Sequence, residues 1–344
     1  AHIAAEARAD NTLALRATTL DREAEVSIPA QVEQAGGVAL PGEVLCALAR
    51  KLSKGGQTQL TLAADRARIV SGSSKYDLHT LPLADFPNSK EMSVQPVVFS
   101  LPAVDLVNLI TPPLAACDGK SFRAYHQGVN VRIAMAKIIA VGTDDKRIAI
   151  QTLDIPKGAA SMPAFCLPAD AARLVIETLT GREGDAELAI SSTLFEMRLP
   201  GVRIASALID CKLPEYGQLM PKTAPCVTLR PYALAEALER ATVVFLGQAD
   251  PGKRVPFVEL EITVAGITLR AGIKGDERAT EMVEIEAATG EAAMKLNARH
   301  LAECLAMWPE SVAIGIAQDA HGKPVLFSAK DRPDMLCLLA STVI

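Results

Sequence analysis

The sequence contains five copies of one pattern, and this internal repeat restricts the possible folds more than any other feature. Each copy is a short apolar strand that ends in leucine, followed by an amphipathic helix. The five anchor leucines are Leu40, Leu101, Leu167, Leu229 and Leu296, with successive gaps of 61, 66, 62 and 67 residues. A nearly constant period of this length indicates a chain built from similar structural blocks.

The register of the predicted helices supports the repeat. Apolar residues recur five, eight and nine positions after an anchor leucine; after Leu101 they are Leu106, Leu109 and Ile110. Spacings of three and four residues place such side chains on one helical stripe, which must pack against another part of the protein. The helices are predicted within residues 41–54, 101–113, 168–182, 230–242 and 297–308.

Alternating apolar and polar residues follow the helices. Residues 195–206 alternate on both sides of Pro200-Gly201, and residues 258–269 on both sides of Ala265-Gly266. A period of two with glycine-containing turns is typical of antiparallel hairpins with one buried face. Each block is therefore predicted to be a strand, a helix and a hairpin.

Two proline-rich stretches, residues 81–88 and 208–221, close pairs of blocks and mark the predicted domain boundaries. The sequence thus predicts an α+β protein of three similar domains, 1–95, 96–222 and 223–344, each made of two strand–helix–hairpin blocks. The chain begins in mid-strand at Ala1, so we expect the first domain to be truncated at its amino terminus.

Composition and motifs argue against an enzyme. The sequence has no Gly-x-Gly-x-x-Gly, Walker loop, Gly-x-Ser-x-Gly or His-Glu-x-x-His motif, and we expect no cofactor and no catalytic site. The seven cysteines are an odd number and contain no Cys-x-x-Cys, which argues against a disulfide framework and against a zinc site. Such cysteine usage favours a protein of the reducing cytoplasm. Asp144 and Asp145 are weak metal candidates, because adjacent carboxylates on one turn usually point apart. No apolar run is long enough to cross a membrane.

The net charge of −5 restricts nucleic-acid binding to a localised basic surface.

The chain resembles the bacterial DNA polymerase III β subunit family, the sliding clamps. The matching stretches are AHIAAEA, LRATTLDREAEVSIPA, IVSGSSKYDLHTLPLADFP, VGTDDKRIA, LIDCKLPEYGQLMP and LNARHLAECL, in this order along the chain. The resemblance implies a non-catalytic processivity factor. It implies a head-to-tail homodimer that closes into a ring of six similar domains, with antiparallel sheets outside and helices lining a hole around duplex DNA. It also implies a sixth helix in a segment before Ala1.

The resemblance further implies a pocket for peptides of the clamp loader and DNA polymerases, between the second and third domains. It maps to Thr143, Arg147, Ile148, Pro214, Gln218, Leu219, His300, Leu338 and Ala340. An apolar cleft with a few polar groups suits a short linear motif. Without the resemblance, residues 144–147 would be interpreted as a solvated charged turn.

Two departures from the family pattern bear on this pocket. The family usually has Gly-His where this chain has Asp145-Lys146, and it usually ends in Met-Pro-Met-Arg-Leu where this chain has Ala-Ser-Thr-Val-Ile at 340–344. Exchange of methionine for alanine removes a flexible apolar wall. We therefore expect altered pocket depth and partner preference.

Two further surfaces follow from the resemblance. The dimer interface would place Tyr76 and Leu78, on an edge strand, against Val243 and Val244 at the end of a helix. An unpaired apolar edge strand is an aggregation hazard, although both residues could instead belong to the core of their own sheet.

The DNA-binding residues that the resemblance implies are Lys75, Lys120, Arg123 and Tyr125.

The predicted helices carry almost balanced charge, so DNA binding should be weak and lost early as salt rises. An alternative function stays open: a clamp-like paralogue, encoded on a mobile element or serving an accessory role, with altered partners or no loading. The altered tail and the missing opening block motivate it.

Overall fold

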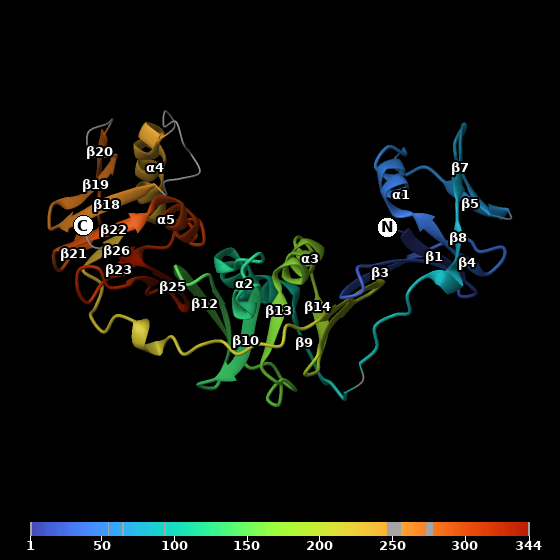
Figure 1. The fold of residues 1–344 in the computed structure, drawn as a ribbon, viewed down its shortest axis with the longest axis horizontal. Helices are drawn as coiled ribbons and strands as arrows, with labels where there is room; N and C mark the ends of the chain where they lie inside the picture. Colours follow the sequence, from blue (N-terminus) through green and yellow to red (C-terminus); the bar gives the residue numbers. More distant parts are fainter. Residues whose placement is uncertain are drawn as a thin grey trace. The chain divides into compact units, whose positions relative to one another are not determined.

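The computed structural model describes residues 2–53, 55–63, 65–92, 94–245, 256–272 and 278–342. The chain forms two compact units, and Figure 1 labels their helices and strands. The first contains Ala1–Pro102, Pro156–Pro163 and Glu183–Leu208; the second contains Ala103–Ile155, Ala164–Arg182 and Ile209–Ile344.

The first unit contains two antiparallel sheets. The larger has the strand order β8 (Leu81–Pro82), β4 (Gly36–Pro41), β1 (His2–Arg8), β2 (Thr12–Thr18), β3 (Arg22–Pro29), β16 (Val202–Ala207), β15 (Leu194–Leu199), β14 (Asp185–Ile190) and β9 (Val97–Pro102). The smaller has the order β5 (Thr58–Ala63), β6 (Arg66–Ser71) and β7 (Ser74–His79). Helix α1 (Gly42–Ala49) and the short 3-10 helix η1 (Leu83–Asp85) complete the described part of this unit.

The second unit also contains two antiparallel sheets. One has the order β13 (Phe165–Pro168), β10 (Gly128–Ala134), β11 (Lys137–Thr143), β12 (Arg147–Asp154), β25 (Arg332–Leu339), β24 (Val325–Ala329), β23 (Ile314–Ala317), β17 (Val227–Leu229) and β21 (Ala287–Ala288). The other has the order β20 (Arg278–Val283), β19 (Gly266–Gly272), β18 (Phe257–Thr263), β22 (Ala292–Asn297) and β26 (Ser341–Thr342). Its helices are α2 (Ala103–Ala116), α3 (Ala169–Leu179), α4 (Pro231–Thr242) and α5 (Ala298–Leu305), with 3-10 turns η2 (Ala124–His126), η3 (Gly217–Leu219) and η4 (Val243–Phe245).

The predicted repeat is confirmed. Each anchor leucine lies in a strand that leads into a helix, namely β4 into α1, β9 into α2, β13 into α3, β17 into α4 and β22 into α5. All five anchor leucines are at most 3% exposed. The predicted hairpins are confirmed as well, with β15 and β16 meeting at Pro200-Gly201 and β18 and β19 at Ala265-Gly266. The α+β prediction and its strand–helix–hairpin blocks are therefore correct.

Blocks are joined in pairs by an exchange of strands. The first hairpin strand of one block pairs with the strand that carries the anchor leucine of the other: β10 pairs with β13, and β14 pairs with β9. The same exchange joins β18 to β22 and β23 to β17. Two continuous sheets cross the predicted domain boundaries, through the pairs β3–β16 and β12–β25.

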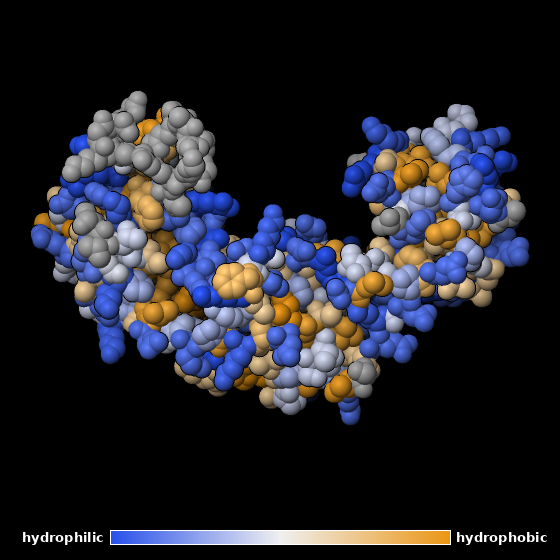
Figure 2. All heavy atoms as spheres, in the orientation of Figure 1, coloured by the Kyte–Doolittle hydropathy of each residue, from blue (hydrophilic) through white to orange (hydrophobic). Residues whose placement is uncertain are grey.

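Helix α1 is far less buried than the other α-helices of the described residues. Its single buried residue is Gly42, while Leu45 and Leu48 are half-buried and Val44 is 47% exposed. By contrast, α2 packs against α3 and α4 packs against α5. Figure 2 shows apolar surface in the region of α1.

Helix α2 continues beyond its predicted end. The prediction stopped at Pro113, but the helix runs through Pro112 and Pro113 to Ala116, and both prolines are buried. The carbonyl of Pro113 packs directly against Gly142 of β11, so closely that a Cβ at Gly142 would overlap its oxygen. Tertiary packing therefore maintains a helix that proline alone would interrupt.

We expect Gly142→Ala to lower the free energy of unfolding by about 3 kcal/mol, because the added methyl group has no space and one backbone must move. Denaturant unfolding followed by circular dichroism measures the change. Gly217→Ala is the matched control, since nothing lies within 4 Å of a Cβ built there. Equal stability of the two variants would show that α2 and β11 can separate at little cost.

A buried charge network lies in the first unit. Glu23 and Glu196 are 1% and 5% exposed, and both accept hydrogen bonds from the Arg203 guanidinium. Arg16 forms a further ion pair with Glu23 at 3.1 Å. Burial acts to lower the pKa of Arg203, but Glu196 and Glu23 outweigh it and raise that pKa above its usual value. Arg203 also donates to the carbonyl of Lys90 at 2.6 Å, which fixes the segment after β8 to the sheet.

Candidate functional site

The second unit contains an apolar pocket of about 210 Å³. Its walls come from the ends of β11, β12 and β25, from the turn of residues 144–147, and from the segment of residues 213–219. Seven of the nine residues predicted for a peptide pocket line it: Thr143, Arg147, Ile148, Pro214, Leu219, Leu338 and Ala340. These seven residues, which are far apart in the sequence, thus lie together in the second unit.

The apolar floor follows from strand alternation. Val141, Ile148 and Leu338 belong to one buried cluster on neighbouring strands of the nine-stranded sheet. Leu213 and Tyr216 pack against this cluster from the connecting segment. Because their aliphatic and aromatic surfaces face an open cavity, a ligand with apolar side chains would remove further apolar area from water.

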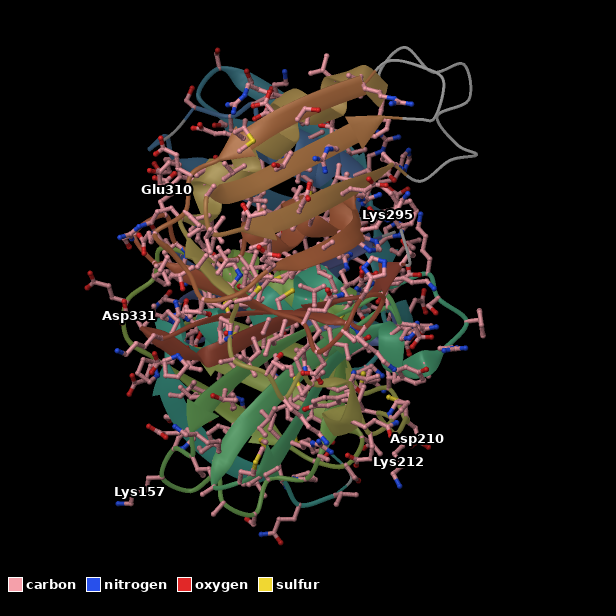
Figure 3. The ribbon with its side chains drawn as sticks, turned by 90° about the vertical axis from the view of Figure 1, so that its left-hand side faces the viewer. Lys157, Asp210, Lys212, Lys295, Glu310 and Asp331 are labelled. Carbon is pink, nitrogen blue, oxygen red and sulfur yellow. The ribbon has the colours of Figure 1, made fainter. Side chains whose placement is uncertain are left out.

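The segment of residues 209–223 is held at both ends. Ile209 donates its N–H to the carbonyl of Cys166 at 3.0 Å. The N–H groups of Thr223 and Lys222 donate to one carboxylate oxygen of Asp319, at 2.9 and 2.8 Å, and they lower the pKa of that carboxyl group. Between these ends, Asp210 and Lys212 project outward from the chain (Figure 3). The segment is therefore a fixed wall of the pocket.

The 144–147 turn forms the polar rim. Thr143 Oγ1 donates to the carbonyl of Arg147 at 2.8 Å, and Asp144 Oδ1 accepts the N–H groups of Lys146 and Arg147. The Arg147 guanidinium, 9% exposed, forms ion pairs with Asp144 and with Glu303 of α5. These ion pairs fix Arg147 in the wall of the pocket. Its guanidinium therefore contributes to the shape of the pocket, while its charge is already paired with Asp144 and Glu303.

Two of the predicted pocket residues do not line the cavity. Gln218 is exposed on η3, and His300 lies half-buried on α5. Burial lowers the pKa of His300, with Asp144 acting to raise it and Arg147 to lower it, so the imidazole lies near the 144–147 turn without reaching the cavity. Ala340 lies at the rim, where its N–H donates to the carbonyl of Lys146 at 2.7 Å. Val343 and Ile344 of the altered tail lie outside the described residues.

The prediction omitted several lining residues. They are Val141, Asp145, Lys146, Leu213, Glu215, Tyr216, Pro324 and Leu339, together with Tyr125, which was predicted to bind DNA. Leu213 and Tyr216 belong to the same LPEYGQL stretch as Pro214. Their apolar character next to a predicted lining residue was the signal that could have identified them.

The predicted DNA-binding residues are distributed over both units. Lys75 is exposed on β7 in the first unit; Lys120, Arg123 and Tyr125 lie in the second, between α2 and β10. Arg123 donates to the Tyr125 hydroxyl at 3.1 Å and forms an ion pair with Asp145. Arg123 and Tyr125 therefore belong to one hydrogen-bonded group at the edge of the pocket.

The predicted dimer residues occupy an edge strand and a helix end. Strand β7 is the last strand of its sheet, and Tyr76 and Leu78 are half-buried opposite the buried Ile69 and Ala67. Both side chains thus pack partly on their own sheet. On η4, Val243 is 58% exposed, whereas Val244 packs against the core of the second unit.

The described residues contain no group of three or more His, Cys, Asp or Glu side chains arranged to hold a metal. Asp144 and Asp145 point to different partners, Arg147 and Arg123 respectively. None of the described helices has the length and apolar character needed to span a membrane.

Comparisons with known proteins agree along the chain. Residues 5–90 match the sequence profile of the DNA polymerase III beta subunit, N-terminal domain, and residues 100–215 match that of its central domain. The beta sliding clamp of Proteus mirabilis is 26% identical over 303 residues, which cover 86% of this chain and 79% of that protein. The clamp of Caulobacter vibrioides is 27% identical over 300 residues, or 84% and 78% of the two chains.

Solved structures share the fold. A sliding clamp from Bartonella birtlesii, crystallised with griselimycin, has a TM-score of 0.91 at 23% identity and covers 100% of this chain and 91% of its own. The clamp of Caulobacter crescentus has a TM-score of 0.88 at 23% identity, with the same coverage. Since the two profiles account for more than half of the sequence and the fold agrees throughout, the chain belongs to the family of bacterial DNA polymerase III β subunits, the sliding clamps.

Proposed function

We propose that this chain acts as a DNA sliding clamp whose pocket captures short peptides of the clamp loader and of DNA polymerases. Sliding clamps are non-catalytic processivity factors of the replicative polymerase, so the chain is not an enzyme. The observation that carries the proposed peptide site is the apolar pocket of the second unit, lined by seven of the nine predicted residues. A paralogue without loading is not favoured, because the matched relatives are sliding clamps.

The proposed assembly is a head-to-tail homodimer of three-domain chains, with domains 1–95, 96–222 and 223–344. Two sheet edges support it: β7 ends the three-stranded sheet of the first unit, and β20 ends the five-stranded sheet of the second, beside α4. Edge strands with open N–H and C=O groups pair readily with another chain. In this proposal β7 of one chain meets the η4 and β20 region of its partner, with Val243 in the interface.

DNA contact is proposed through Lys75, Lys120, Arg123 and Tyr125, and the site of action is the bacterial cytoplasm. The net charge of −5 and the nearly balanced charge of the helices support weak, salt-sensitive contact with phosphates. Topological enclosure by a ring does not require strong contacts.

The peptide site is tested by titrating a labelled Gln-Leu-x-Leu-Phe peptide and following fluorescence anisotropy. We expect a Kd of about 1 µM for the wild-type chain, corresponding to about −8 kcal/mol. Tyr216→Ala should weaken binding about 30-fold, because a buried aromatic contact of this kind contributes about 2 kcal/mol.

Met135→Ala is the matched control, since Met135 is 86% exposed and does not line the pocket. Absence of wild-type binding at about 1 mM peptide, which corresponds to about −4 kcal/mol, would contradict the proposed pocket function.

A further inference from the structure

Asp145 occupies an unusual backbone position beside the pocket. Its φ is 66°, in the left-handed region that favours glycine. A side chain in this region costs of order 1 kcal/mol of strain, although aspartate tolerates it better than most residues. The contacts of its carboxylate must offset that strain.

Side chains of the loop of residues 118–126 converge on the carboxylate of Asp145. Arg123 forms an ion pair with Asp145 Oδ2, Tyr125 donates its hydroxyl to Oδ1 at 3.4 Å, and His126 Nε2 lies 2.9 Å from Oδ1. His126 Nδ1 lies 2.9 Å from Ser121 Oγ, so a neutral imidazole that donates through Nε2 has both ring nitrogens satisfied. Burial and the Arg123 charge lower the pKa of His126, which favours this neutral form.

The same loop, residues 118–126, presents groups that suit nucleic acid. Phe122 is 91% exposed, Lys120 is exposed, and the Arg123 guanidinium lies 5.6 Å from the centroid of the Phe122 ring. An exposed aromatic ring beside basic side chains can stack on a base while the cations pair with phosphates. Arg123, however, already has a carboxylate partner within its own chain.

We propose that Asp145 is an internal competitor for Arg123, so that its carboxylate and a phosphodiester of DNA bind the same guanidinium in turn. Arginine pairs with carboxylates and phosphates through the same fork of N–H groups, and Arg123 contacts Asp145 through Nη1. A phosphate that binds the Nη1 edge of this guanidinium therefore displaces the Asp145 carboxylate. The inference rests on the proposed function, because it requires DNA to reach the 118–126 loop. Asp145 is a positioning residue here, since it acts through Arg123.

This competition couples the DNA surface to the pocket. Asp145 and Tyr125 both line the cavity. When a phosphate binds Arg123, Asp145 loses the ion pair that offsets its backbone strain. The wall of the pocket that contains Asp145 then becomes less rigid. Bound DNA should then weaken peptide binding, and bound peptide should weaken DNA binding by the same factor.

The test compares Asp145→Asn with the wild-type chain, using a short fluorescein-labelled DNA duplex at about 50 mM salt, where phosphate contacts are strong. We expect Asp145→Asn to bind the duplex about 5-fold more tightly. The matched control is Asp154→Asn, which removes the same charge from an exposed residue paired with Lys137 at 2.6 Å. In an Arg123→Gln background, Asp145→Asn should give no gain, because the guanidinium through which it acts is absent.

The second measurement is the peptide Kd with and without saturating duplex. The wild-type chain should lose about 5-fold in peptide affinity, and Asp145→Asn should lose none. The inference is overturned if Asp145→Asn binds DNA as Asp154→Asn does, if its gain persists without Arg123, or if wild-type peptide binding is indifferent to DNA. A wild-type chain that binds neither probe contradicts the proposed function as well, which separates the two failures.

Discussion

The Val243→Asp variant is expected to be a monomer at micromolar concentration, whereas the wild-type chain should have a mass of twice 36.4 kDa. Val243 is 58% exposed on η4, so a carboxylate there is well solvated in the free chain. In the proposed dimer it would be buried without a partner, at a cost of several kcal/mol. Light scattering in line with size-exclusion chromatography measures the mass, and small-angle scattering tests for a ring.

Val264→Asp is the control for this experiment. Val264 is 76% exposed at the turn between β18 and β19, outside the proposed interface, so the same substitution should leave the dimer intact. Val244 is left unchanged because it packs against the core of its own unit. A Val243→Asp variant that stays dimeric would place the interface elsewhere.

Replacement of Arg203 by methionine is expected to lower the free energy of unfolding by about 3 kcal/mol. The side chain joins Glu23 and Glu196, two carboxylates that are almost fully buried, and its loss leaves like charges close together in a poorly hydrated site. Removal of one partner of a buried ion pair costs about 3–5 kcal/mol, and two remaining ion pairs, Arg16 with Glu23 and Arg198 with Glu196, keep the expected loss at the lower end. Denaturant unfolding measures it.

Arg68→Met is the control: its ion pair with Asp77 is exposed, and such pairs contribute about 1 kcal/mol or less. A loss no larger than that of Arg68→Met would show that the two buried carboxylates do not depend on Arg203.

The blocks were predictable because they depend on local pattern. An anchor leucine such as Leu167 ends a strand, precedes a helix and is buried, and the spacing alone indicated all three. The end of α2 was predicted wrongly at Pro113, because the contact that maintains the helix comes from Gly142, a residue of a different segment. The tendency of proline to end a helix was outweighed there by packing between α2 and β11.

The pocket was predictable only in part, for a related reason. Thr143 and Leu338 could be mapped by resemblance, and both line the cavity. His300 was mapped in the same way but does not line the cavity; Arg147, which does, forms an ion pair with Glu303 of the same helix α5. The role of Asp145 had no signal in the sequence beyond its departure from glycine, since its partners Arg123 and His126 approach it only in the folded chain.

The exchange of strands between paired blocks has a consequence for synthesis on the ribosome. A block such as the one that begins with β9 cannot complete its sheets alone, because β9 pairs with β14 and β10 pairs with β13, and β13 and β14 are made later. Its apolar helix stripe therefore stays open until the second block has emerged, during the period when nascent chains are most prone to aggregate. The smallest part of the chain that can fold as it is translated is thus a pair of blocks.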